Sequence, residues 1–451
     1  MIATTALLLT VQFSKAPEPT DLLPRKGALG VAFSPVPADL ATKLNLKPGT
    51  GLLAQKPVPG LTAAAAGVTP GDVITSLNGQ AITPQNVGVV IRGLSSGKEL
   101  KISVLRDGKP QVLVAVLAEK PRDPGNDNFS VEYSHVVSNG KRMRTIITTP
   151  KKPGRHPGFM FIQGLSPVSY DFKLEGPADL SRIDAPLLYE MANSGYVTIR
   201  VDKPGVGDSE GGPYETVDYI TELDIYRQTM KQLTARKDVD TSNLFIFGHS
   251  MGGSFGPMIA TETPLKGIAV YGTAGRTWRE YLNDTLRYQG QLAGDTFSNL
   301  DETVRLVGRI MDMAFYDKMS VAEIKKKHPE LANLVDAYMP GGLFNGKNAE
   351  FWGQLGTINF AAYWEKVNTR VLAVKGESDF VVYEADHKLI ADIVNRANPG
   401  WGRFEIAESS DHLFNKWPSE KESLANWPKG EFNMEFTNMM KAWMADLISK
   451  K

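Results

Sequence analysis

The sequence predicts two domains, a small strand-rich one followed by a larger α/β domain with a mostly parallel sheet. Residues 24–120 contain short strand-like segments separated by tight turns. From residue 129 onward, strands alternate with helical stretches, which is the pattern of a parallel sheet covered by helices on both faces. Between them, residues 121–128 (P-R-D-P-G-N-D-N) have the composition of a linker. A length of 451 residues fits this division, because it exceeds the usual size of one hydrophobic core.

The composition excludes several classes of function. Fifty basic and fifty acidic residues cancel, and the short lysine run at 325–327 is best explained as a solvated helix face. Nucleic-acid binding requires a clustered basic surface, so we expect no nucleic-acid partner. The chain has no cysteine, which rules out a thiol nucleophile, a disulfide framework and a zinc–thiolate site. We expect neither a metal nor a cofactor.

The N-terminal segment, residues 1–23, resembles the remnant of a secretory signal. Its apolar run at 6–11 is followed by the sequence S-K-A, but a basic region is missing and Pro17 disfavours cleavage there. We therefore favour a periplasmic or secreted protein and keep a cytoplasmic location as the alternative. No other stretch approaches the roughly 18 continuous apolar residues of a membrane span.

The first domain carries specific turn and helix signals. Asn78-Gly79 between two apolar segments is a strong signal for a two-residue hairpin turn. Pro84 suits the first position of a helix, and apolar residues follow it at helical spacing. The expected elements are strands at 51–54, 72–77, 100–105 and 112–117 and a helix at 84–94.

Residues 63–74 (A-A-A-A-G-V-T-P-G-D-V-I), with L-N-G at 77–79, form a recognisable motif. The motif and the element order resemble a PDZ domain of the circularly permuted kind found in bacterial proteases of the high-temperature-requirement type. PDZ grooves bind an extended peptide and hold its terminal carboxylate. The resemblance implies five peptide-binding positions, three in a carboxylate-binding loop and two on the helix: Leu29, Gly30, Val31, Val87 and Ile91.

The second domain, residues 129–451, alternates between strands and helices apart from one interruption. Residues 276–363 are helical and rich in methionine and aromatic side chains, so we interpret them as an inserted cap. The expected strands are two within 129–150, then 159–162, 197–201, 244–247, 267–270, 371–374 and 404–406. The expected helices outside the cap are 185–194, 219–235, one from about 251, 383–397 and 434–448.

The strongest chemical signal is G-H-S-M-G at 248–252, which follows an apolar strand and opens a helix. A serine hydroxyl is a weak nucleophile, so it must project from a tight strand-to-helix turn toward a base. The flanking glycines tolerate the crowded backbone of such a turn. Ser250 is therefore the predicted nucleophile, and the Met251 N–H at the helix start is a predicted oxyanion donor.

The nucleophile needs a base and an acid to orient it. The strand at 371–374 runs into G-E-S-D-F-V-V, where Asp379 is the predicted acid, and His412 after the next strand is the predicted base. Glu377 and Asp411 are the rival acids. Asp411 adjoins the histidine, and neighbouring side chains in an extended segment point apart.

Two further loops belong to this pattern. Gln163-Gly164-Leu165 follows the strand at 159–162, and the Leu165 N–H is the predicted second oxyanion donor. Residues 202–211 (D-K-P-G-V-G-D-S-E-G) follow the next strand, and we interpret them as a structural turn. They are not a dinucleotide-binding motif, since G-x-G-x-x-G is lacking.

Together these motifs resemble the α/β hydrolase fold, in the branch of serine aminopeptidase-like enzymes and bacterial esterases. Gln163 departs from the usual histidine before the glycine, which puts that loop's side-chain contacts in doubt. The resemblance implies a serine hydrolase with a Ser250–His412–Asp379 triad that cleaves carboxylic esters through an acyl-enzyme. One alternative is a peptidase or amidase acting on small peptides. The other is a PDZ scaffold whose hydrolase domain is inactive.

Overall fold

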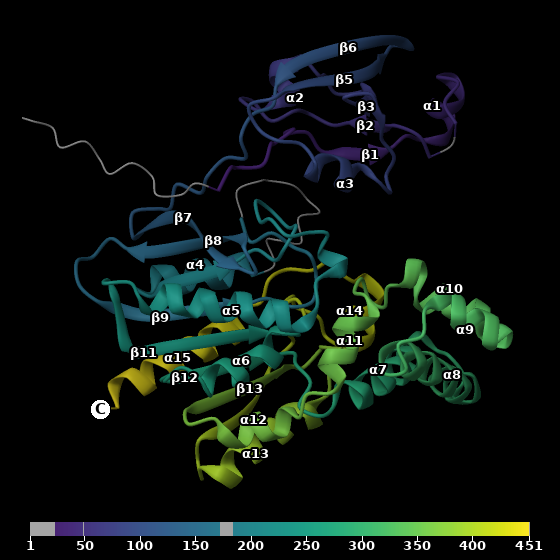
Figure 1. Cartoon of the computed structure of the whole chain (residues 1–451). Coiled ribbons are helices and arrows are strands. Elements are labelled where there is room, and N and C mark those ends of the chain that lie inside the picture. Colours follow the sequence, from purple (N-terminus) through teal and green to yellow (C-terminus); the bar gives the residue numbers. More distant parts are fainter. Residues whose placement is uncertain (1–22, 48, 172–183, 451) are drawn as a thin grey trace, which may run out of the picture.

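The computed structural model describes residues 23–47, 49–171 and 184–450, and it shows a small β-rich domain beside a larger α/β domain (Figure 1). The expected signal remnant falls almost entirely outside the described residues. Within these three ranges, no helix is both long and apolar enough to cross a membrane.

The small domain is built on one twisted sheet with the strand order β1-β2-β3-β5-β6, and β4 pairs with β3. Asn78 and Gly79 have φ of 49° and 78°, as the predicted hairpin turn between β3 and β4 requires. The strands are β1 (Phe33–Pro35), β2 (Leu52–Ala54), β3 (Val73–Leu77), β4 (Gln80–Ala81), β5 (Glu99–Arg106) and β6 (Lys109–Val116), and the helices are α1 (Ala38–Lys43), α2 (Thr62–Ala66) and α3 (Val87–Arg92).

Helix α3 is shorter than the predicted 84–94. Thr83 N–H donates to Asn86 Oδ1 at 2.8 Å, and Asn86 N–H donates to Thr83 Oγ1 at 3.3 Å. These reciprocal side-chain bonds hold residues 83–86 in a turn, so the helix begins only after it. Pro84 therefore lies in this turn, ahead of the first residue of the helix.

The large sheet has eight strands in the order β14-β13-β12-β11-β9-β10-β8-β7. The six strands from β14 to β10 are parallel to their neighbours, whereas β8 and β7 join them as an antiparallel edge. The strands are β7 (Phe129–Ser138), β8 (Lys141–Pro150), β9 (His156–Ile162), β10 (Val197–Val201), β11 (Val239–His249), β12 (Gly267–Tyr271), β13 (Arg370–Gly376) and β14 (Gly402–Ala407).

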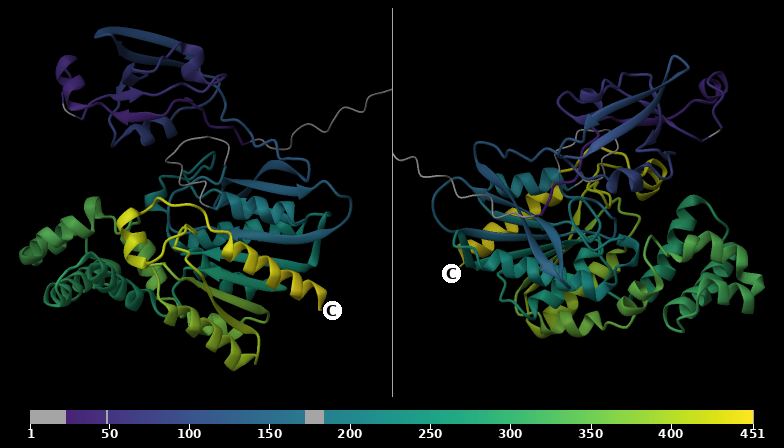
Figure 2. Two further views of the ribbon diagram at one scale, coloured as in Figure 1. Left: turned by 180° about the vertical axis from the view of Figure 1, so that it is seen from behind. Right: turned by 45° about the horizontal axis from the view of Figure 1, so that its top comes forward.

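Helices cover both faces of this sheet, as predicted. One core cluster packs α4 (Ala185–Asn193) and α15 (Glu435–Ser449) on one face. Figure 2 shows α15 crossing this face when the molecule is seen from behind. A second cluster packs the other face against α5 (Tyr219–Thr234), α6 (Gly252–Ala260) and α13 (Glu384–Ala397).

The inserted region lies between β12 and β13 and is helical, as predicted. The helices within residues 278–338 stand beside the sheet, on the opposite side of the large domain from β7, whereas the helix at 360–366 packs against α13 and α6 (Figure 1). They are α7 (Trp278–Ala293), α8 (Phe297–Phe315), α9 (Val321–Lys327), α10 (Ala332–Tyr338), α11 (Ala349–Gly356) and α12 (Phe360–Lys366), with the short 3-10 helices η3 (Pro329–Leu331) and η4 (Pro340–Gly342). The helix α14 (Glu420–Asn426) was not expected from the sequence.

A buried ionic cluster joins the two domains. The Arg25 guanidinium donates to Asp208 Oδ2 at 2.5 Å and to Asp171 Oδ2 at 2.6 Å, and these side chains are at most 2% exposed. Arg144 adds a bond to Asp208 at 3.0 Å, and Tyr133 donates to Asp171. Since Arg25 begins the small domain and the other four belong to the large one, the two domains are held together by charge as well as by chain connectivity.

Candidate active site

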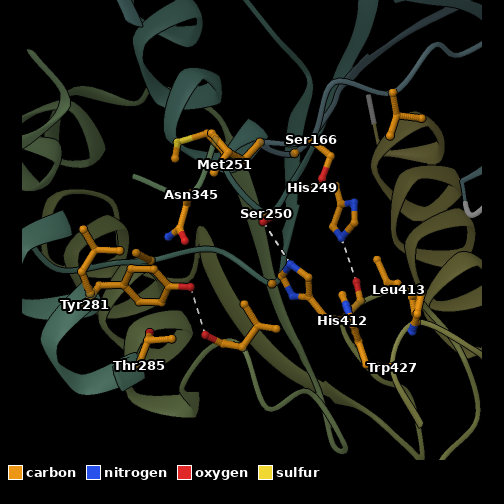
Figure 3. A pocket seen from close by; sticks show the side chains of 18 of the residues that line it. Ser166, His249, Ser250, Met251, Tyr281, Thr285, Asn345, His412, Leu413 and Trp427 are labelled. Carbon is orange, nitrogen blue, oxygen red and sulfur yellow. Dashed lines mark hydrogen bonds between the residues drawn. The ribbon is translucent and has the colours of Figure 1, made fainter. Parts of the chain in front are cut away.

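Ser250 sits in a sharp turn between β11 and α6, at the carboxyl end of the parallel strands. Its φ is 55°, the left-handed region that a non-glycine residue seldom adopts. The neighbouring backbone is very close: a Cβ added at Gly252 would lie 2.0 Å from the Ile162 carbonyl oxygen. The glycine is therefore needed for the turn to approach β9, and the turn presents the Ser250 side chain to the cavity above the sheet (Figure 3).

The structure brings the predicted nucleophile, base and acid together in one hydrogen-bonded chain. Ser250 Oγ lies 3.0 Å from His412 Nε2, and His412 Nδ1 lies 2.9 Å from Asp379 Oδ2. The second oxygen of Asp379 accepts from the Val381 N–H at 2.8 Å, which fixes the carboxylate. The acid follows β13 and the base follows β14, so all three groups come from the carboxyl ends of parallel strands in one sheet, with β12 between the nucleophile strand and β13.

The electrostatics of this chain favour a charged pair between acid and base. Burial alone would lower the pKa of His412, but the charge and hydrogen bond of Asp379 outweigh it and raise that pKa above its ordinary value. Burial would likewise raise the pKa of Asp379, but the same interaction holds it below its ordinary value. The carboxylate is therefore ionised near neutral pH and can stabilise an imidazolium.

The two rival acids have other partners. Glu377 Oε2 accepts from the Ser409 N–H at 2.7 Å. Asp411 Oδ1 accepts two backbone bonds, from Leu413 and Asn415, each at 2.8 Å. Both carboxylates shape the loop that carries His412.

The predicted oxyanion donors lie on either side of the nucleophile. Met251 precedes the first residue of α6, and Gly164 of the opposite loop is so close that an added Cβ would lie 3.2 Å from Ser250 Cβ. Leu165 follows that glycine and lines the same cavity. Gln163, the residue that departs from the usual pattern, donates to the Val201 carbonyl at 2.7 Å and so anchors the loop to β10.

A second histidine, His249, bonds to the backbone of the base. His249 Nε2 donates to the His412 carbonyl at 2.8 Å, and burial lowers the pKa of His249 to about 3, so its ring is neutral. Its Nδ1 lies 3.5 Å from Asp184, a buried carboxyl whose pKa burial raises to about 7. Sequence reasoning placed His249 in the turn but did not foresee either contact.

The cavity around Ser250 measures about 390 Å³. Figure 3 shows Tyr281, Thr285 and Asn345 on one side of the nucleophile and His249, Leu413 and Trp427 on the other. The inserted region supplies much of the first side: Trp278, Tyr281, Leu282, Thr285, Gln289, Asn345 and Trp352.

One functional position was missed by sequence reasoning. Gly272 follows β12, and a Cβ there would lie 2.8 Å from His412 Nδ1 and 3.2 Å from Asp379 Oδ2. Any side chain would therefore displace the pair. A glycine two residues after the predicted strand at 267–270, the next strand after that of the nucleophile, was the available signal.

In the small domain, four of the five predicted peptide-binding positions pack on one core. Leu29 is buried there, and Val31, Val87 and Ile91 pack against the same cluster while remaining partly exposed. Gly30 has a φ of 71°. Strand β1, which follows this loop, stands at one end of the strand order, and α3 runs beside it (Figure 1).

Comparison with known families agrees with this geometry. A profile of the family described as serine aminopeptidase, S33, matches residues 174–412, more than half of the chain. The chain belongs to this family. A PDZ domain profile matches residues 27–116, so the predicted order of PDZ domain and α/β hydrolase is confirmed.

Individual relatives match either the hydrolase domain or the PDZ domain. The Thermotoga maritima esterase EstD is 22% identical over 319 residues, which cover 70% of this chain and 68% of the esterase. A probable DegP-like periplasmic serine endoprotease of Brucella suis is 29% identical over 134 residues, 27% of this chain and 26% of the protease. The Pyrococcus furiosus esterase Pf2001 aligns in structure at 12% identity with a TM-score of 0.44, covering 72% of this chain and 96% of the esterase. This S33 family member is thus a serine hydrolase of the α/β hydrolase fold with a carboxylesterase-like domain.

Proposed function

We propose that this enzyme hydrolyses carboxylic esters through an acyl-enzyme on Ser250, with His412 as base and Asp379 as the acid that orients it. The observation that carries the proposal is the unbroken chain of 3.0 Å and 2.9 Å contacts from Ser250 Oγ through the imidazole to the Asp379 carboxylate.

The geometry supports a two-step reaction. Ser250 Oγ attacks the ester carbonyl carbon while His412 Nε2 takes its proton, and the electron pair of the C=O bond moves to the oxygen. The Met251 and Leu165 N–H groups stabilise that oxyanion. Collapse of this tetrahedral intermediate breaks the bond to the alcohol oxygen, and the alcohol leaves with the proton from His412. Water then repeats the sequence on the acyl-enzyme, releases the acid and restores Ser250.

The cavity favours an apolar or aromatic acyl group. Trp278, Tyr281 and Leu282 on α7 and Trp352 on α11 give the cap side of the cavity apolar walls. Thr285 and Asn345 add a few polar atoms, as is usual for small-molecule sites. A sugar would leave most of its hydroxyls without partners against these walls.

A peptidase or amidase is the second candidate, and the family description favours it. The same triad and oxyanion donors serve amide cleavage, but the leaving amine must then be protonated by His412. A screen of the purified enzyme separates the candidates: p-nitrophenyl esters of acetate to octanoate on one side and aminoacyl p-nitroanilides on the other. Since a serine peptidase would also cleave activated esters, the anilides decide: we expect turnover of the esters and no anilide hydrolysis above background. Efficient hydrolysis of an aminoacyl anilide would reject the ester proposal in favour of the peptidase.

We further propose that the PDZ domain recognises a free peptide C-terminus. An extended peptide would add to the outer edge of β1, with its carboxylate at Leu29, Gly30 and Val31 and its last side chain between β1 and α3. C-terminal peptides from a library should bind the full chain and lose binding on amidation. Binding that is indifferent to amidation would exclude a carboxylate loop here.

A further inference from the structure

Three buried charged side chains lie behind the loop that carries Leu165. Lys203 follows β10, Glu222 is on α5, and Lys347 belongs to the inserted region; their side chains are 2%, 1% and 0% exposed. Lys203 Nζ lies 3.1 Å from Glu222 Oε2, and Lys347 Nζ donates to Glu222 Oε1 at 2.5 Å. Two ammonium groups thus share one carboxylate away from water. Burying such a cluster is costly, so it is weak evidence for a purely stabilising role.

The two lysines differ in their remaining bonds. Lys347 donates to the carbonyls of Tyr214 and Val217, both at 3.0 Å, in the segment before α5. Lys203 instead donates to the Gly164 carbonyl at 2.7 Å and approaches the Leu165 carbonyl at 3.3 Å. One lysine therefore holds a structural segment, whereas the other holds the loop beside the nucleophile.

The bond to Gly164 fixes the direction of the Leu165 N–H. The Gly164 C=O and the Leu165 N–H belong to one peptide unit, and in a planar trans peptide they point in opposite directions. The carbonyl faces Lys203, so the N–H points away from Lys203. Ser250 is close to this peptide, since a Cβ added at Gly164 would lie 3.6 Å from Ser250 Oγ. The Tyr214 hydroxyl, which donates to the Leu165 carbonyl, restrains the next peptide as well.

We propose that Lys203 is a positioning residue of the oxyanion hole: its ammonium holds the Gly164 carbonyl and thereby aims the Leu165 N–H at the oxyanion formed on Ser250. The inference rests on the proposed role of Ser250. A donor on the carbonyl side also polarises the peptide, which strengthens its N–H as a donor. The positive charge of Lys203 also stabilises the negative charge that develops on the oxyanion.

This assigns a role to the turn at 202–211 beyond shaping the backbone. Lys203, the second residue of this turn, bonds to the loop at Gly164. Burial lowers the pKa of Lys203 to about 8 although Glu222 opposes the effect, so the side chain is mainly an ammonium at neutral pH.

The test compares Lys203→Met with the same change at Lys347. Both remove one ammonium from the cluster, but only Lys203 bonds directly to the oxyanion loop, whereas Lys347 reaches it only through Tyr214. For Lys203→Met we expect kcat for p-nitrophenyl acetate to fall about a hundredfold with KM within about threefold, the loss typical of one oxyanion donor. Affinity for phenylboronic acid, whose serine adduct is tetrahedral, should fall by a similar factor. Lys347→Met should change kcat and boronic acid affinity by less than about threefold.

A chemical rescue covers the case in which Lys203→Met does not fold. Because the chain has no cysteine, Lys203→Cys can be alkylated with 2-bromoethylamine at that one position in denaturant and refolded. The added amine should restore kcat at least tenfold over the unalkylated variant. The proposal is overturned if Lys203→Met keeps wild-type kcat and boronic acid affinity, or if the amine restores nothing. A failure of the proposed function looks different, since the wild-type protein itself would neither turn over the ester nor bind the boronic acid.

Discussion

At the residue scale, the triad acid is the position for which the sequence offered rival candidates. Glu377 and Asp379 are two positions apart after the same strand, and both could be drawn next to a histidine. The structure separates them, because only Asp379 reaches His412 while Glu377 bonds to the Ser409 backbone. The sequence located the loop and favoured Asp379, and the structure adds the contact between its carboxylate and His412.

Matched substitutions test this choice. Asp379→Asn should lower kcat by about four orders of magnitude, because the amide favours the wrong histidine tautomer. Glu377→Gln keeps an acceptor for Ser409 and should lower kcat by less than about fivefold. Steady-state kinetics on one ester at saturation measure both. A larger loss in Glu377→Gln than in Asp379→Asn would show that the acid is misassigned.

The pH dependence of activity follows from two groups, one that must lose its proton for activity and one that must keep it. His412 acts as base only when neutral, and its pKa is raised, so kcat/KM should rise with pH through a value above 6.5. Lys203 faces Glu222 on α5, Lys347 of the cap and Tyr214 on η2 (Tyr214–Thr216). Burial lowers the pKa of Lys203 to about 8. The charge of Lys347 lowers this pKa further, whereas Glu222 raises it. Above that pH Lys203 loses its charge, so activity should decline. In Lys203→Arg the rise should remain and the decline should disappear; an unchanged decline would assign it to another group.

At the scale of elements, α7 joins the cap to the active site. Its residues Trp278, Tyr281, Leu282 and Thr285 recur at helical spacing and line the cavity. The sequence predicted a helical insertion rich in large side chains but not which face meets Ser250. That depends on how α7 packs on the following helix α8 and on α11, which comes much later in the chain.

Narrowing this face should change chain-length preference. In Leu282→Trp the larger side chain would fill part of the cap side, so octanoate esters should lose at least tenfold in kcat/KM relative to acetate esters. Gln291→Trp adds the same indole at an exposed position near the end of the same helix and should leave the ratio unchanged. Equal ratios in both variants would mean that the acyl chain does not enter this side.

At the scale of the whole molecule, sequence identified both families and their order, but not how the domains are joined. Arg25 lies at the predicted edge of the PDZ domain, and nothing in the sequence pattern pointed to its partners. Its partners, Asp171 and Asp208, lie more than 140 positions away. The predicted domain limits at 24–120 and 129–451 stay predictions.

The ionic cluster makes a prediction about stability. Arg25→Met leaves two buried carboxylates with fewer partners, so the free energy of unfolding should fall by about 3 kcal/mol. Arg142→Met breaks the Arg142–Glu210 pair on the same side of the domain, which is about one-third exposed, and should cost about 1 kcal/mol or less. Urea unfolding of both full-length variants measures the difference. Equal, small losses would show that the domains are not held through Arg25.

The central claim is that Ser250 is an activated nucleophile, and covalent labelling tests it most directly. A fluorophosphonate reacts at useful speed only with a serine that has a base and an oxyanion hole. Intact-mass measurement should show one adduct per folded chain, peptide mapping should place it on Ser250, and Ser250→Ala should abolish it while circular dichroism stays unchanged. Labelling that persists in Ser250→Ala, or a folded wild-type protein that takes up no label, would contradict the account.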